Sequence, residues 1–281
     1  MPKTVLNLSI IGPDKKGIVA KITKQVFLSN GNIEDINQTV IKNTFYMNLK
    51  ISFQKNIDKK QTINKFEKVA MSLEMECKIK FMSAKKTSNM AILVTREEHV
   101  LLGLIEKLKK KSEKGDIAII ISTTKKLENI AVNNKIPFKT VNTSDQTLRE
   151  KKILELLEEY DIDLIVLARY MKILSPNFVW RYENKIINIH PSILPAFPGA
   201  LAYTQAFERG VKLFGATAHF VTTELDQGPI ICQESFEMDQ SSSLKEIKEK
   251  GKVIETRVII KAVKLFLENK LSTHWGKVYQ K

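Results

Sequence analysis

The hydrophobic pattern of this 281-residue chain changes near residue 85, and this change constrains the fold more than any other feature. Before it, short segments of alternating apolar and polar residues are separated by stretches with the spacing of amphipathic helices. After it, short and almost continuously apolar segments recur between helical stretches. Because the two patterns are typical of different sheets, we expect two domains of different architecture, and the chain is long enough for both.

The first pattern predicts the element order βαββαβ. TVLNLSII (4–11) alternates as a strand does, and the turn GPDKKG (12–17) leads into a helical pattern that ends at Gly31. The remaining predicted elements are strands at 32–41, 44–53 and 76–82 and a helix at about 58–73. Such a split unit forms a four-stranded antiparallel sheet with both helices on one face, the ferredoxin-like arrangement. We assign residues 1–83 to this domain.

The second pattern predicts a mostly parallel, Rossmann-like α/β sheet. SAKKTSN (83–89) is polar and without periodicity, so we interpret 84–89 as a linker and 90–281 as the second domain. The predicted strands are 90–94, 116–121, 163–168 and 185–189, and the predicted helices are 98–111, 126–133, 147–160 and about 175–182. Strands this apolar are buried on both faces. Functional residues of such a sheet are expected beyond the carboxyl ends of its strands.

The charge distribution argues against a nucleic-acid partner. The net charge of +14 divides into +7 over residues 1–84, +1 over 85–243 and +6 over 244–281, and only six of the 45 basic residues are arginine. Dispersed lysines of this kind indicate a solvated surface, whereas nucleic-acid binding would favour an arginine-rich or aromatic stripe. No apolar run reaches the ~18–20 residues of a membrane span, and the N-terminus shows no signal or transit pattern. We therefore expect a cytoplasmic protein with neither membrane nor nucleic-acid partners.

Three polar residues near strand ends carry the candidate chemistry. In IINIHPSILPAFPGA (186–200), Asn188 and His190 are two residues apart and point to the same side of an extended segment. In TAHFVTTELDQGPIICQ (217–233), a further predicted strand ends at Val221, and Asp226 lies in the loop that follows it. An amide that binds a carbonyl oxygen, an imidazole that moves a proton and a carboxylate that orients it suffice for acyl chemistry. Each also has a structural interpretation: His190 as a satisfied core residue, Asp226 as a turn cap, and His219 as a packed neighbour.

These two segments resemble the signature of the folate-dependent formyltransferase family. The resemblance implies that Asn188, His190 and Asp226 form the catalytic trio. It also implies that LARYMKILSP (167–176) holds the pterin of a folate. The residues expected to bind substrate on this basis are Met171, Ile173, Leu174, Ser192, Leu194 and Glu224. No metal is expected, because His, Cys, Asp and Glu show no ligand spacing, and the folate is expected as substrate with no permanently bound cofactor.

The N-terminal segment IIGPDKKGIVAKITKQVFLSNGNIEDINQ (10–38) resembles an ACT regulatory domain. Gly12, Asp14 and Gly17 lie at its strand-to-helix turn, where backbone N–H groups suit the carboxylate of a ligand. The resemblance implies dimerisation and an amino-acid effector, glycine or methionine. The alternative is that the turn only closes the fold and that the domain only dimerises.

An ACT domain ahead of such a catalytic domain resembles the formyltetrahydrofolate deformylase branch, which implies hydrolysis of 10-formyltetrahydrofolate to formate and tetrahydrofolate. The formate and tetrahydrofolate would balance one-carbon pools for purine synthesis, and a homo-oligomer, dimer or tetramer, is implied as well. The alternative acceptor is glycinamide ribonucleotide, whose phosphate the family holds on a glycine-rich loop after the first strand. Here that loop reads TREEH (95–99), and two carboxylates would repel a phosphate by about 1 kcal/mol per charge at ~4 Å even in water.

One motif favours the transferase. Deformylases of the family commonly carry His-His-Ser, whereas this chain has His190-Pro191-Ser192, the form usual in the transferases. A catalytically silent ACT-type sensor is a third possibility if this loop has lost its activity. The absent phosphate loop and the ACT domain favour the deformylase.

Overall fold

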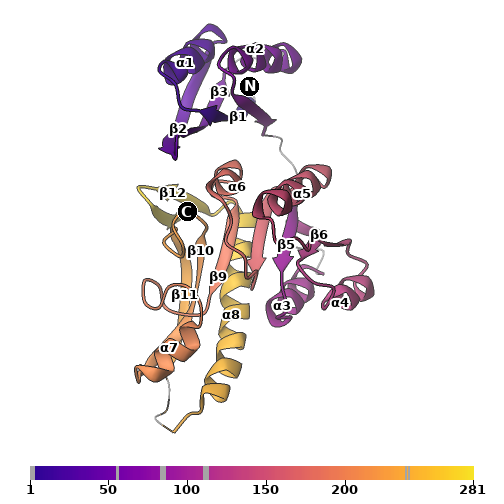
Figure 1. The fold of residues 1–281 in the computed structure, drawn as a ribbon, viewed down its shortest axis with the longest axis vertical. Helices are drawn as coiled ribbons and strands as arrows, with labels where there is room; N and C mark the ends of the chain where they lie inside the picture. Colours follow the sequence, from indigo (N-terminus) through magenta and orange to yellow (C-terminus); the bar gives the residue numbers. More distant parts are fainter. Residues whose placement is uncertain (1–3, 55–56, 83–86, 110–113, 238, 240) are drawn as a thin grey trace. The chain divides into compact units, whose positions relative to one another are not determined.

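The computed structural model describes residues 4–54, 57–82, 87–109, 114–237, 239 and 241–281. The chain divides into two compact units, Met1–Lys85 and Lys86–Lys281, which are treated separately here (Figure 1). Residues 84–86 of the predicted linker lie outside the described residues. Its last two residues, Ser88 and Asn89, already belong to the first strand of the second unit.

The N-terminal unit has the predicted order βαββαβ. Its elements are β1 (Thr4–Pro13), α1 (Ile18–Leu28), β2 (Gly31–Ile41), β3 (Thr44–Phe53), α2 (Lys59–Ser72) and β4 (Glu76–Phe81). The strands form an antiparallel sheet in the order β2-β3-β1-β4. Ile22 of α1 and Phe66 of α2 pack in one cluster with Leu8 of β1 and Met47 of β3, so both helices cover the same face (Figure 1). The predicted ferredoxin-like arrangement is confirmed.

The C-terminal unit is built around a seven-stranded sheet. Its elements are β5 (Ser88–Val94), α3 (His99–Leu108), β6 (Gly115–Ser122), α4 (Glu128–Asn133), β7 (Phe138–Thr140), α5 (Gln146–Glu159), β8 (Leu164–Ala168), α6 (Pro176–Arg181), β9 (Ile186–His190), α7 (Ala202–Glu208), β10 (Leu213–Phe220), β11 (Ile230–Glu237), α8 (Leu244–Leu267), β12 (Leu271–His274) and β13 (Lys277–Gln280). The strand order is β11-β10-β9-β8-β5-β6-β7, and β12 pairs with β13 in a separate hairpin. β10 runs antiparallel to both of its neighbours, β9 and β11, and the other pairings in this sheet are parallel.

Helices cover both faces of this sheet, as the apolar strands predict. Alternate residues of β5 point to opposite sides: Ile92 packs in a cluster with α3 and α8, while Leu93 packs in a cluster with α5 and α6. The 24-residue helix α8 begins at a capping box formed by Ser243 and Glu246 and lies along β9, β10 and β11 (Figure 1). Each large apolar side chain that it buries contributes roughly 1.5–3 kcal/mol.

Four elements of the C-terminal unit, β7, α7, β12 and β13, were not expected from the sequence. β7 has three residues, too few for a strand pattern, and it pairs only with β6. α7 begins after Leu201, which has a left-handed backbone with φ of 61°, and its seven residues are too few to show a helical period. No helix in the described part of the chain is long and apolar enough to cross a membrane.

Candidate active site

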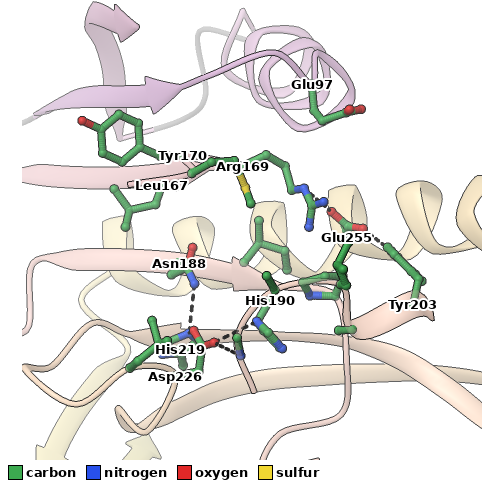
Figure 2. Close-up of a pocket in the computed structure, with 18 of the residues that line it drawn as sticks. Glu97, Leu167, Arg169, Tyr170, Asn188, His190, Tyr203, His219, Asp226 and Glu255 are labelled. Atoms are coloured by element: carbon green, nitrogen blue, oxygen red, sulfur yellow. Dashed lines mark hydrogen bonds and ion pairs between the residues drawn. The ribbon is translucent and has the colours of Figure 1, made fainter. Parts of the chain in front are cut away.

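A cavity of about 880 Å³ opens where β8 and β9 end, next to the antiparallel β10. This is the edge at which a parallel sheet is expected to carry its functional residues. Asn188, His190 and Asp226 all line the cavity (Figure 2). The three residues that the sequence analysis singled out therefore meet in one place.

His190 and Asp226 form a buried pair. Nδ1 of His190 lies 3.3 Å from Oδ2 of Asp226, and the two side chains are 5% and 7% exposed. The carbonyl oxygen of Phe197 is an acceptor only, so Nε2 of His190 must carry the hydrogen of their 2.8 Å hydrogen bond. Gly199 donates its backbone N–H to Oδ2 of Asp226 at 2.8 Å. These contacts leave Nδ1 as the nitrogen of His190 that can exchange a proton.

His219 fixes the amide of Asn188. The antiparallel register of β9 and β10 places the two residues opposite each other. Burial lowers the pKa of His219, and its Nδ1 donates to the carbonyl of Phe220 at 2.9 Å, so the ring is neutral with a free lone pair on Nε2. That lone pair accepts from Nδ2 of Asn188 at 3.2 Å. His219 therefore fixes the orientation of the Asn188 amide. The second amide hydrogen of Asn188 stays available to a ligand in the cavity.

The segment after β8 forms one wall of the cavity, and its two ends are anchored. The backbone N–H of Met171 donates to Oγ1 of Thr95 at 3.1 Å. The buried carboxylate of Glu150 on α5 accepts from the backbone N–H of Ser175 at 2.7 Å and also from the Ser175 hydroxyl. Between these anchors, the side chains of Met171 and Ile173 are 59% and 67% exposed. Because the segment is fixed at both ends and its apolar side chains are exposed, a flat aromatic ligand could pack against them.

The remaining residues expected to bind substrate divide into two groups. Leu174 and Glu224 line the cavity together with Met171 and Ile173. Ser192 and Leu194 are buried in the loop after β9, where the Ser192 hydroxyl donates to the carbonyl of Ala196 and the backbone N–H of Leu194 donates to Oγ1 of Thr217 at 3.0 Å. In this arrangement, Ser192 and Leu194 hold the loop that carries Phe197 and Gly199.

A second polar cluster in the cavity wall was not predicted from the sequence. Glu255 of α8 is 1% exposed and accepts from Nε2 of His99 at 3.1 Å and from the hydroxyl of Tyr203, while Nε of Arg169 lies 3.8 Å away (Figure 2). A signal was present, because Glu255 falls in the stripe of α8 that is otherwise apolar or small. That stripe comprises Ile247, Gly251, Ile254, Val258, Ile259 and Ala262.

The loop after β5 presents a carboxylate to the cavity. Glu97, in the TREEH segment, lines the cavity together with His99, the first residue of α3. Within the described ranges, no group of three or more His, Cys, Asp or Glu side chains is arranged to hold a metal ion.

At the turn between β1 and α1 of the other unit, Gly17 takes the N-cap position of the helix with φ of 86°, in the left-handed region that favours glycine. No side chain caps this helix start. Asp14 is exposed, and its backbone N–H donates to the carbonyl of Asn43 at 2.9 Å. Gly12 packs so closely on Met75 that a Cβ would lie 2.6 Å from Sδ. Gly12 therefore serves the packing of the turn, and no side chain binds the N–H groups at the start of α1.

Two family models match, one for each unit. The ACT domain model matches residues 4–82, and the Formyl transferase model matches residues 88–263. Together with the parallel sheet and the Asn188, His190 and Asp226 site, these matches define a formyl transferase domain preceded by an ACT domain.

Relatives that match both units show to which family of formyl transferase-domain proteins the chain belongs. The chain is 39% identical over 271 residues to the formyltetrahydrofolate deformylase of Bacillus subtilis, covering 94% of this chain and 90% of the relative. For that of Escherichia coli K12, the identity is 35% over 260 residues, and 91% of each chain is covered. The chain belongs to the formyltetrahydrofolate deformylases.

Solved structures of deformylases match a larger share of this chain than those of transformylases do. The structure of a formyltetrahydrofolate deformylase from Pseudomonas syringae pv. tomato matches with a TM-score of 0.68 and 32% identity, covering 99% of this chain and 94% of that chain. A glycinamide ribonucleotide transformylase from Symbiobacterium toebii matches with a TM-score of 0.66 and 29% identity, but it covers only 71% of this chain. The likeness to the transformylase therefore leaves more than a quarter of the chain unmatched.

Proposed function

We propose that this chain hydrolyses 10-formyltetrahydrofolate to formate and tetrahydrofolate. The observation that carries this proposal is the agreement with named deformylases along both units, at up to 39% identity. The transformylase structure, by contrast, corresponds to about seven-tenths of the chain. Glu97 at the cavity edge gives independent support, because its carboxylate disfavours a phosphate-bearing acceptor there.

The folate is proposed to lie along the wall formed by the segment after β8. The pterin would pack against Met171, Ile173 and Leu174, and Glu224 would contact it from the loop after β10. This placement brings the formyl group on N10 toward Asn188, His190 and Asp226, which line the same cavity.

In the proposed reaction, Asp226 and His190 position a water molecule and take its proton. Nε2 of His190 is bound to Phe197, so Nδ1 accepts the proton, and the carboxylate 3.3 Å away stabilises the imidazolium that forms. The water oxygen bonds to the formyl carbon. The free amide hydrogen of Asn188 and the protonated His190 stabilise the resulting oxyanion. The bond from carbon to N10 then breaks, N10 takes the proton held by His190, and the product loses its remaining hydroxyl proton to solvent and leaves as formate.

The direct test is to incubate the purified protein with 10-formyltetrahydrofolate, with and without glycinamide ribonucleotide, and to measure formate and tetrahydrofolate. Formate release without the ribonucleotide is the expected result. Turnover only with the ribonucleotide would identify a transferase, and no turnover in either mixture would favour a catalytically silent sensor.

For the N-terminal unit, we propose an amino-acid effector, glycine or methionine, bound by its carboxylate at the start of α1. The support is the ACT match together with the uncapped N–H groups after Gly17. Calorimetric titration of the full chain with a panel of amino acids should give heat for one of these two. No heat for any amino acid would favour a purely structural role for the turn between β1 and α1.

Two further expectations remain predictions. The chain is proposed to assemble as a dimer or tetramer, as the likeness to ACT-containing deformylases implies. A cytoplasmic location is proposed by likeness to the bacterial relatives, whereas the relatives from Arabidopsis thaliana are named as mitochondrial.

A further inference from the structure

The cluster around Glu255 brings four separate elements to one wall of the cavity. His99 begins α3, Arg169 directly follows β8, Tyr203 lies in α7 and Glu255 lies in the middle of α8. Each of the four residues lines the cavity. A carboxylate that is 1% exposed would be costly without partners, and here one cation and two hydrogen-bond donors surround it.

Two glycines make this convergence possible. Gly251 lies one turn before Glu255 in α8, and a Cβ there would meet the hydroxyl oxygen of Tyr203 at 2.3 Å. Gly103 lies one turn after His99 in α3, and a Cβ there would meet Cγ2 of Thr256 at 2.2 Å. The missing side chains therefore allow α7 and α3 to approach α8 closely on either side of Glu255, which brings Tyr203 and His99 within reach of its carboxylate.

Glu255 is arranged to hold its neighbours rather than to exchange protons. Burial alone would raise the pKa of Glu255, but the hydrogen bonds from His99 and Tyr203 and the charge of Arg169 together outweigh burial and lower it. Burial and the nearby carboxylate raise the pKa of Tyr203, so its hydroxyl stays protonated and donates. Arg169 has a left-handed backbone with φ of 59°, a conformation that is unfavourable for a non-glycine residue and typical of functional sites.

The cluster lines the cavity together with Asn188, His190 and Asp226. In the view of Figure 2, His190 lies between Leu167 and Tyr170 on one side and Glu255 and Tyr203 on the other, and the Arg169 side chain extends toward Glu255. If the folate occupies the wall after β8, the opposite wall is where a formyl acceptor larger than water would have to enter.

We propose that Glu255 is a specificity-determining positioning residue: by holding Arg169, Tyr203 and His99 against α8, it closes the acceptor side of the cavity to molecules larger than water. This inference rests on the proposed deformylase activity. On this proposal, two features make water the acceptor in place of an amine. One is the packed and charged cavity wall around Glu255, and the other is the missing phosphate loop.

The test is a competition between water and a small amine that lacks a phosphate. The wild-type chain and the variants Glu255→Gln and Tyr203→Ala are given 10-formyltetrahydrofolate with glycinamide, and formate and N-formylglycinamide are both quantified. In the transfer reaction, the amine nitrogen bonds to the formyl carbon, the bond to N10 breaks and the amine proton passes to N10. We expect the fraction of formyl groups transferred to the amine to rise about tenfold in both variants.

Matched controls separate this proposal from simple damage to the fold. Glu234→Gln removes a carboxylate that pairs with Arg257 of α8 at 2.8 Å and does not line the cavity, and it should leave the product ratio unchanged. Tyr203→Phe keeps the ring and removes only the hydroxyl, so it should raise the amine fraction less than Tyr203→Ala does; it also carries the test if the other variants fail to fold. An unchanged ratio in folded, hydrolysing Glu255→Gln, or in Tyr203→Phe if it alone folds, would overturn the proposal. A wild-type chain that releases no formate would instead refute the proposed function.

Discussion

Asp226 has a left-handed backbone with φ of 55°, and this conformation directs its carboxylate to both His190 and the N–H of Gly199. A non-glycine residue in this region is uncommon and is favoured mainly for Asp and Asn. The pair formed by Asp226 and His190 is therefore held by local backbone geometry in addition to burial. A change in either side chain should affect the chemistry more than the fold.

Asp226→Asn and His190→Ala should each lower kcat for formate release by at least about 10²–10³-fold, because each removes a group that stabilises charge in the transition state. The measurement is the steady-state release of formate, with circular dichroism to confirm that each variant is folded. Retention of wild-type activity by both folded variants would contradict the proposed mechanism.

His219 predicts a pH dependence of stability. Burial holds the pKa of His219 below its ordinary value of 6.5, so just below pH 6.5 the unfolded chain binds more protons than the folded chain. The contribution of neutral His219 to the free energy of unfolding is therefore present above pH 6.5 and falls as the pH drops through and below this value. Urea unfolding between pH 5 and 8 should show a smaller decrease in His219→Gln, which has no titrating group at this position; an identical decrease would contradict this prediction.

At the level of residues, spacing along a strand and position after a strand made Asn188, His190 and Asp226 candidates, because these are local properties, and the resemblance to the formyltransferases gave them their expected catalytic roles. It did not indicate the partners of these residues. The hydrogen bond between Asn188 and His219 depends on the register of β9 and β10, and the contacts of Glu255 come from three other elements. Such long-range contacts have no local signal in the chain.

At the level of elements, Glu150 of α5 anchors the end of the segment after β8, where we propose that the folate binds. Glu150→Gln replaces a buried carboxylate that accepts from the backbone and hydroxyl of Ser175, and hydrogen bonds to a charged group contribute about 1.5–3 kcal/mol each. Loss of about one such bond should raise KM for the folate about tenfold, with a smaller change in kcat. Glu155→Gln, at an exposed position of the same helix, is the matched control and should leave KM unchanged.

The approach of α7 to α8 gives a prediction about stability. Gly251→Ala gains about 1 kcal/mol in helix propensity, but the added methyl group would lie 2.3–2.6 Å from three atoms of Tyr203, and overpacking typically costs about 1–3 kcal/mol. Tyr203 is stacked on Phe214 at 4.9 Å between ring centroids and has little room to move, so we expect a net loss of stability. In a Tyr203→Ala background, the same substitution should stabilise the protein. Thermal unfolding of the four proteins measures this coupling, and additive effects would exclude it.

The predicted elements mostly agree with the structure, and the differences have physical causes. The predicted helix at 147–160 corresponds to α5 at Gln146–Glu159, and the predicted strand at 163–168 corresponds to β8 at Leu164–Ala168, because both have strong apolar periods. β7 and α7 were missed because each is shorter than the window that reveals a period and is held mainly by tertiary contacts.

At the level of the whole molecule, the change in hydrophobic pattern near residue 85 coincides with the division into two compact units. The near-neutral stretch 85–243 contains Asn188, His190 and Asp226, the proposed catalytic residues, and the excess of lysine lies in the N-terminal unit and in residues 244–281, which include α8. Part of this basic charge reaches the cavity, because Lys245, Lys248 and Lys252 of α8 line it. This distribution agrees with a lysine-rich surface.

The measurement that tests the account most directly is formate release from 10-formyltetrahydrofolate by the purified full-length chain without any amine acceptor. The account predicts stoichiometric formate and tetrahydrofolate, and loss of both products in Asp226→Asn. Formyl transfer that occurs only when glycinamide ribonucleotide is added, with no formate in its absence, would contradict it.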